Sequence, residues 1–222
     1  MRAFKTRISF KKKLNNLTET LEDISEVTLD NYKKAIQLYG KKDPELNREV
    51  KENVLLVNKE GVELEKICIE IIATEQPFAL DLRFIESCIK LSSYLKRINH
   101  ISSKVADSFM ETDFDEIPED LTKQIKKMAD LTGQMLVKSI NAFMDQDVEL
   151  AKELRADDKE VDILFDNMLE EFKDVIFDNK EAINSLMNII FIARYLERIA
   201  DKAVSIADRL MFMLHYKNPK KE

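Results

Sequence analysis

Four carboxylates in the second half of the chain have the residue types and spacing of a metal site. Asp158 and Asp162 are four residues apart, and so are Glu197 and Asp201. On a helix, residues at this spacing lie one above the other, and two like charges so placed destabilise it by about 0.2–0.5 kcal/mol. A bound cation would offset that repulsion, because carboxylate oxygens suit hard divalent cations and also iron or manganese.

The simpler alternative is that neighbouring basic side chains neutralise these acids through solvent, since acidic pairs are common on solvated helix faces. The basic residues in question are Lys159, Arg194, Arg198 and Lys202. Spacing alone leaves both interpretations open.

The position of the acids around each helix predicts a site on the surface. Glu197 and Asp201 lie about 100–140° around the helix from the apolar residue Leu196. This placement argues against a buried di-metal oxidase, which would also need Glu-x-x-His motifs projecting inward. The chain has only His100 and His215, and neither completes such a motif.

Long helices must position these side chains, because residues that break helices are rare. The 222 residues include three glycines and four prolines, too few for the many turns of β-rich folds or for glycine-rich nucleotide loops. Apolar residues recur at steps of three and four, as in Ile192, Leu196 and Ile199, which is typical of amphipathic helices. We therefore expect an all-α fold with six long helices. Their expected ranges are 10–40, 44–75, 78–112, 118–144, 148–177 and 181–216.

The helices fall into two repeats. The segment that begins Asp43-Pro-Glu-Leu aligns with the one that begins Asp147-Val-Glu-Leu, and Tyr94-Leu-Lys-Arg-Ile aligns with Tyr195-Leu-Glu-Arg-Ile. These matches occur in the same order, which indicates a duplication. We expect two tandem three-helix bundles related by a pseudo-twofold axis, one over residues 1–114 and the other over 115–222.

Composition and sequence motifs exclude several classes of protein. The net charge of −7 does not favour a nucleic-acid binder, which needs a basic surface. No apolar run reaches the roughly 18 residues of a membrane span. The two cysteines, Cys68 and Cys88, are expected as buried free thiols. The chain has no phosphate-binding loop, so direct phosphate sensing finds no support in the sequence.

The second repeat resembles the PhoU family of phosphate-transport regulators. The resemblance rests on Asp158-Lys-Glu-Val-Asp162 and on the stretch from Ala193 to Ala207, which contains Leu-Glu-Arg-Ile-Ala-Asp. Gln76-Pro-Phe-Ala-Leu-Asp-Leu-Arg83 is similar to the segment that opens the third helix of the family's first repeat. The resemblance to the family covers essentially the whole chain, and it implies a fold of two three-helix bundles.

The resemblance also implies a metal and partners. Family members bind metal ions on their surface through Glu/Asp-x-x-x-Asp motifs, and the corresponding ligands here are Asp158, Asp162, Glu197 and Asp201. Iron is the metal that the family favours, with magnesium, manganese and zinc as alternatives. The implied partners are the phosphate ABC transporter, a membrane sensor kinase where one exists, and a second copy of the chain. The implied location is the cytoplasm, including the inner face of the membrane.

The first repeat departs from the family pattern. Val54, Asn58, Lys96 and His100 stand where the family carries acids. A lysine ammonium offers no lone pair and repels a cation. We therefore expect one metal site, in the second bundle, and a degenerate counterpart in the first.

Three functions remain in competition. The favoured one is a non-enzymatic negative regulator of phosphate uptake. The first alternative is a metal-free helical scaffold or dimerisation module, whose carboxylates would respond only to salt. The second is a metal-dependent enzyme, which the near absence of histidine disfavours because no general acid or base is evident.

Overall fold

The structure is a computed structural model that describes residues 2–178 and 182–215. Within these residues the chain forms six long α-helices and the short 3-10 helix η1, with no β-strand, so the all-α expectation is confirmed. The helices are α1 (Arg2–Gln37), α2 (Pro44–Glu75), α3 (Ala79–Glu111), η1 (Phe114–Glu116), α4 (Glu119–Asp145), α5 (Val148–Asp178) and α6 (Ile183–His215).

Helix ends agree with the sequence expectations to within about two residues, except in α1. That helix begins at Arg2 rather than near residue 10, because no glycine or proline interrupts the first 13 residues. It ends at Gln37, three residues early, in a turn that reaches Gly40 with φ +64°. The expected junction at Asn179 and Lys180 lies outside the described residues.

The expected N-caps form where local sequence specifies them. Asp43 accepts hydrogen bonds from the backbone N–H groups of Glu45 and Leu46, both at 3.1 Å, and Pro44 occupies the first helical position of α2. Asp147 accepts one from the N–H of Leu150 at 3.0 Å. Each cap satisfies backbone donors that lack a partner within the helix.

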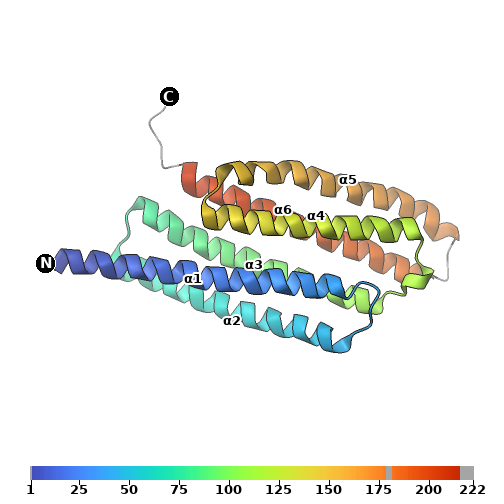
Figure 1. Cartoon of the computed structure of the whole chain (residues 1–222), viewed down its shortest axis with the longest axis horizontal. Helices are drawn as coiled ribbons and strands as arrows, with labels where there is room; N and C mark the ends of the chain where they lie inside the picture. Colours follow the sequence, from blue (N-terminus) through green and yellow to red (C-terminus); the bar gives the residue numbers. More distant parts are fainter. Residues whose placement is uncertain (1, 179–181, 216–222) are drawn as a thin grey trace, which may run out of the picture.

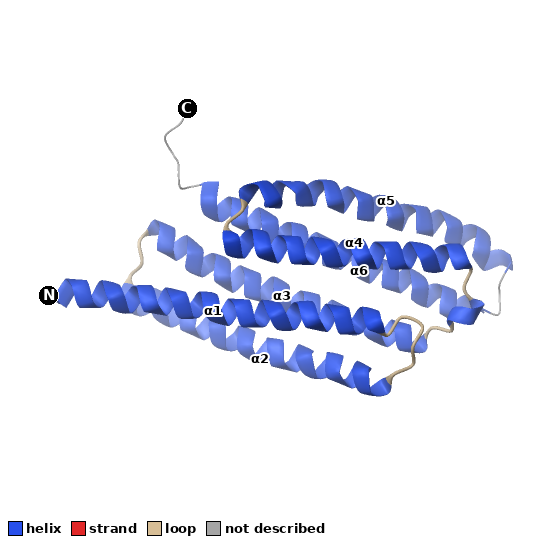
Figure 2. Ribbon diagram, in the orientation of Figure 1, coloured by secondary structure: helices blue, strands red, loops and turns tan. Residues whose placement is uncertain are grey.

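The helices pack as two three-helix bundles that lie side by side, as Figure 1 shows. The first bundle contains α1 to α3 and the second contains α4 to α6, while α2 and α5 lie at opposite outer edges. The loops are confined to the helix ends (Figure 2). The expected pair of bundles is thus confirmed. The division at residues 114 and 115 stays a prediction; η1 lies at that point in the chain.

Most of the contact between the bundles is made by α3 and α6. Both helices bury small side chains, among them Ser102 and Ala106 on α3 and Ala203 on α6. Arg209 of α6 also reaches across, pairing with Glu86 and donating from Nε to Ser87 Oγ at 3.1 Å.

Glycines 61 and 133 lie inside helices, where their lack of a side chain serves packing. A Cβ atom at position 61 would lie 2.8 Å from Lys96 Cδ and 2.8 Å from Ser92 Oγ on α3. A Cβ at position 133 would lie 3.0 Å from Cε1 of Tyr32 on α1. Both contacts are tighter than ordinary van der Waals distances, so each glycine permits one close helix approach.

Two further expectations concern the thiols and the membrane. Cys68 and Cys88 are buried free thiols, as expected, and burial raises the pKa of Cys68 to about 12 and that of Cys88 as well. Among the described helices, none combines the length and apolar character needed to cross a bilayer.

Candidate metal centre

The two acidic pairs lie on adjacent helices of the second bundle. α5 carries Asp158 and Asp162 beside the buried residue Val161, and α6 carries Glu197 and Asp201 beside the buried residue Leu196. α5 and α6 pack against each other, and both apolar neighbours belong to the core, so the acids beside them lie at the edge of the same interface.

Burial divides the four carboxylates into two kinds. Asp162 and Asp201 are exposed, whereas Asp158 is half-buried and the Glu197 side chain is only 14% exposed. The cluster therefore lies at the bundle surface, as its position around the helices indicated, with two members partly withdrawn from solvent.

The two pairs lie close enough for their charges to act on one another. Burial raises the pKa of Asp158 to about 6, with further contributions from the charges of Asp162 and Asp201. The pKa of Glu197 is also raised, first by burial and then by Asp201 and Asp162, while Arg194 and, to a smaller extent, Arg198 oppose the shift. Charges on α5 thus act on α6 and the reverse, which the sequence alone did not establish.

The cluster is only partly neutralised by basic side chains. Arg194 Nη1 donates to Glu197 Oε1 at 2.8 Å, but the other oxygen, Oε2, is buried without a hydrogen-bond partner among the described residues. Lys202, another of the nearby cations, lies over the Tyr94 ring of α3, with its Nζ 5.9 Å from the ring centroid. A buried carboxylate oxygen without a partner is costly, so the donor set suits a hard cation that would supply one.

The side chains as they stand are not gathered into a coordination shell. In the described part of the chain, no three His, Cys, Asp or Glu side chains converge closely enough to hold a metal ion. Binding would therefore require the carboxylates to turn toward each other. The four ligands stay a prediction that the chemistry of the cluster supports.

The first bundle has a different surface at the equivalent place. Val54 is half-buried, Asn58 and His100 are exposed, and Lys96 Nζ pairs with Glu65 Oε1 at 2.7 Å. The stem of Lys96 crosses the position that Gly61 leaves open. The aligned positions of the second repeat are Phe165 for Gly61 and Glu197 for Lys96, so the two bundles differ in both packing and charge.

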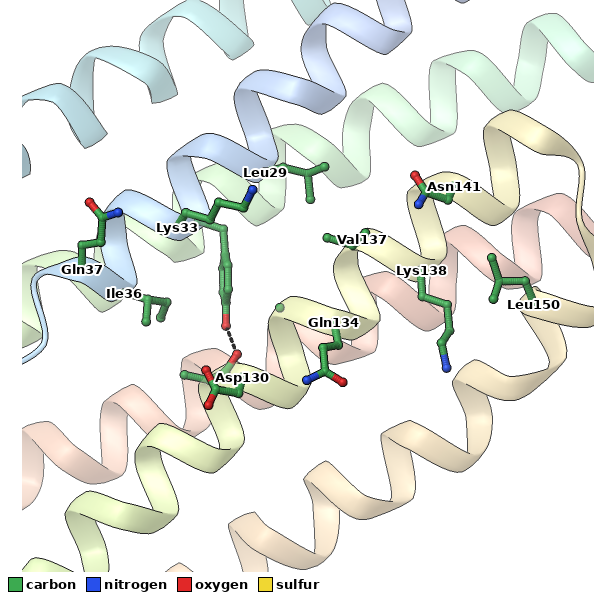
Figure 3. A pocket seen from close by; sticks show the side chains of 13 residues that line it. Leu29, Lys33, Ile36, Gln37, Asp130, Gln134, Val137, Lys138, Asn141 and Leu150 are labelled. Atoms are coloured by element: carbon green, nitrogen blue, oxygen red, sulfur yellow. Dashed lines mark hydrogen bonds between the residues drawn. The ribbon is translucent and has the colours of Figure 1, made fainter.

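A feature that sequence reasoning did not identify is a groove of about 780 Å³ between α1 and α4. Figure 3 shows Leu29 and Val137 pointing toward each other across it, with Lys33 and Gln134 nearby. At its base the buried Tyr32 hydroxyl donates to the carbonyl of Ala129 at 2.6 Å, and burial raises its pKa well above the usual range. The signal in the sequence was Gly133, which makes room for this ring.

Comparison with known proteins shows similarity over nearly the whole chain. The family model for the PhoU domain matches residues 21–109 and 125–210. The phosphate-specific transport system accessory protein PhoU homolog 1 of Methanothermobacter thermautotrophicus is 44% identical over 213 residues, which cover 96% of this chain and 97% of the relative. The corresponding Escherichia coli protein is 28% identical over 80% of this chain and 73% of its own.

Solved structures are similar in fold as well. The crystal structure of PhoU from Pseudomonas aeruginosa superposes with a TM-score of 0.88 at 26% identity, covering 93% of this chain and 99% of that one. The PhoU structure from Streptococcus pneumoniae, at 22% identity, shares the fold with a TM-score of 0.83 over 92% of this chain and 96% of that chain.

Proposed function

Because the chain belongs to the PhoU family, we propose that it is an accessory protein of phosphate transport that restrains phosphate uptake and the phosphate-starvation response. One observation carries this proposal: both halves match the PhoU domain, and the similarity to an accessory protein of the phosphate-specific transport system covers nearly the full length. The partners we propose are the phosphate ABC transporter and, where the cell has one, its membrane sensor kinase.

The mechanism rests on surface recognition rather than on catalysis. Six helices of 27 to 36 residues present long, rigid faces of the kind that bind other helices and domains. We propose a non-enzymatic protein of the cytoplasm, which meets its partners at the inner face of the membrane and acts as a homodimer.

In the proposed holo form, a metal ion links α5 to α6. Asp158, Asp162, Glu197 and Asp201 would hold it, with iron as the favoured metal and magnesium, manganese or zinc as alternatives. When bound, the ion would supply the positive charge that the cluster lacks. Asp158 and Glu197 would lose the repulsion that adds to the effect of burial in raising their pKa values, so that α5 and α6 become fixed relative to each other.

Capture of partners from cells grown in ample phosphate tests the regulatory role. The tagged full-length protein is expected to retain phosphate-transporter components, with loss of binding in cells that lack the transporter. Recovery of neither transporter nor sensor components from crosslinked cells would overturn the proposal.

Elemental analysis of protein purified without chelators tests the metal site. Asp162→Asn combined with Asp201→Asn is expected to remove the bound metal, because it removes one carboxylate from each helix. The matched control is Asn58→Ala with His100→Ala at the equivalent positions of the first bundle, which should retain the wild-type metal content. Stoichiometric metal in the Asp162/Asp201 double variant would refute the ligand assignment.

Thermal unfolding separates this proposal from the metal-free scaffold. A metal that binds only the folded protein stabilises it by mass action, by about 2.7 kcal/mol at a free concentration one hundred times Kd. Chelation is therefore expected to lower Tm in the wild type and to leave the double variant unchanged. Identical transitions with and without chelator would favour the scaffold.

A further inference from the structure

The surface of the first bundle that corresponds to the carboxylate cluster forms a cationic pocket. A cavity of about 490 Å³ opens between α2 and α3, lined by Asn58, Val62, Ser93, Lys96, Arg97 and His100. Among the described residues, none that lines it carries a carboxylate. The aligned surface of the second repeat carries Asp162, Glu197 and Asp201 in place of Asn58, Lys96 and His100, so the duplication has kept the location and reversed the charge.

The charge of this pocket comes chiefly from Arg97. Its side chain is exposed, and no ion pair or hydrogen bond occupies it among the described residues. Lys96 also lines the cavity, but its Nζ pairs with Glu65 Oε1 at 2.7 Å. The charge of the lysine is therefore largely neutralised by that of the glutamate. The Arg97 guanidinium is therefore the uncompensated positive charge of the pocket. Its planar arrangement of N–H donors matches the geometry of an oxyanion.

The remaining polar residues of the pocket are able to donate hydrogen bonds. Ser93 lies one turn before Arg97 on α3, and His100 follows three residues later, so all three share one face of the helix. Asn58 comes from the neighbouring helix α2. A hydroxyl, an amide N–H₂ and an imidazole N–H around one guanidinium form a set of donors suited to the several oxygens of a tetrahedral anion.

We propose that this pocket binds a tetrahedral oxyanion of the phosphate type, with Arg97 as the principal contact. The proposal goes beyond regulation through protein contacts, and it is independent of the metal in the other bundle. No phosphate loop was present in the sequence; the site is instead assembled from two helices, and each of its residues taken singly is an ordinary surface side chain.

Two sources could supply such an anion. One is free phosphate. The other is the phosphoryl group of a lipid, because Val62 on the pocket wall belongs to a line of exposed apolar residues on α2 at seven-residue spacing. These residues are Leu55, Val62 and Ile69, which are 70%, 47% and 62% exposed. An apolar line beside a cationic pocket is suited to a membrane surface.

The first arm of the experiment titrates the full-length protein with inorganic phosphate. The ring protons of His100 serve as the NMR reporter, assigned by comparison with a His215→Gln variant because the chain has only these two histidines. Phosphate is expected to shift the His100 resonances, and Arg97→Gln is expected to weaken binding about tenfold through loss of a charge-assisted contact. Circular dichroism confirms that the variant is folded.

The matched control is Arg198→Gln, at the aligned position of the second repeat. There the surrounding acids repel an anion, so phosphate binding should stay within about twofold of the wild type. The second arm measures sedimentation with vesicles of phosphatidylglycerol and, for comparison, of phosphatidylcholine.

The outcomes identify the source or overturn the site. Binding of phosphate that depends on Arg97 supports a free-anion site, and vesicle binding that depends on both Arg97 and phosphatidylglycerol supports a lipid phosphoryl group. If Arg97→Gln changes neither arm, or if Arg198→Gln weakens binding equally, the proposal is wrong. Both arms use purified protein, so their failure leaves the capture of transporter components unaffected.

Discussion

Replacing Asp158 by asparagine should stabilise the metal-free protein. The neutral amide has nearly the same shape, but it carries no charge to be buried or repelled, and these are the two effects that raise the pKa of this carboxyl from 3.8 to about 6. A shift of that size corresponds to about 3 kcal/mol of destabilisation of the ionised form. Because the side chain is only half-buried, solvent screening reduces the expected gain to about 1 kcal/mol.

The pH dependence has a definite sign. A carboxyl whose pKa is higher in the folded than in the unfolded protein binds more protons in the folded state, so its contribution to stability is lost as pH rises. For Asp158 the loss falls between pH 3.8 and about pH 6. The difference between Asp158→Asn and wild type should thus be greatest above pH 6 and should shrink toward pH 4.

Urea unfolding in the presence of EDTA, at pH 7.5 and at pH 4.5, measures both quantities. At pH 7.5 the variant should gain about 1 kcal/mol, or about 2–4 °C in Tm for a chain of this size. The control is Asp23→Asn on α1, an exposed aspartate, which should change stability by less than about 0.5 kcal/mol. A variant no more stable than wild type at pH 7.5, or a gain that is independent of pH, would refute the electrostatic account of the cluster.

Three further predictions concern packing and helix ends. Tyr32→Phe removes the buried hydrogen bond to Ala129 and should cost about 1 kcal/mol in urea unfolding; no loss would mean that the bond adds nothing. Gly133→Ala improves helix propensity by about 1 kcal/mol, but it places a Cβ 3.0 Å from the buried Tyr32 ring, an overlap that costs about 1–3 kcal/mol. The substitution should therefore destabilise the wild-type protein and stabilise a Tyr32→Ala variant, in which the ring is absent. Asp43→Ala and Asp147→Ala should each lower stability by about 1 kcal/mol through loss of an N-cap, a result to be checked by thermal unfolding, and unchanged Tm values would contradict the capping assignments.

The sequence predicted the carboxylate cluster less completely than it predicted the helices. Spacing placed the two acidic pairs on helix surfaces, because the side-chain positions on a helix follow from residue number. It did not show that the charges of Asp162 and Asp201 act on Asp158. Nor did it distinguish Arg194, which pairs with Glu197, from the other nearby cations.

What the sequence determined by itself is the set of helices, the ends of all but α1, and the duplication. These depend on local rules: Asp43 and Pro44 start α2, and Asp147 caps the start of α5. The same local character explains why both copies of the repeat were recognisable.

Only the tertiary structure decided what lies between helices. The role of Gly61 and Gly133 follows from the side chains of Lys96 and Tyr32, which occupy the space where a Cβ atom would lie. In the same way, Asn58 on α2 and Arg97 on α3 are separated by 39 positions in the sequence and line one cavity in the fold. Burial, charge coupling and pocket shape are properties of pairs of helices, and no spacing along a single helix contains them.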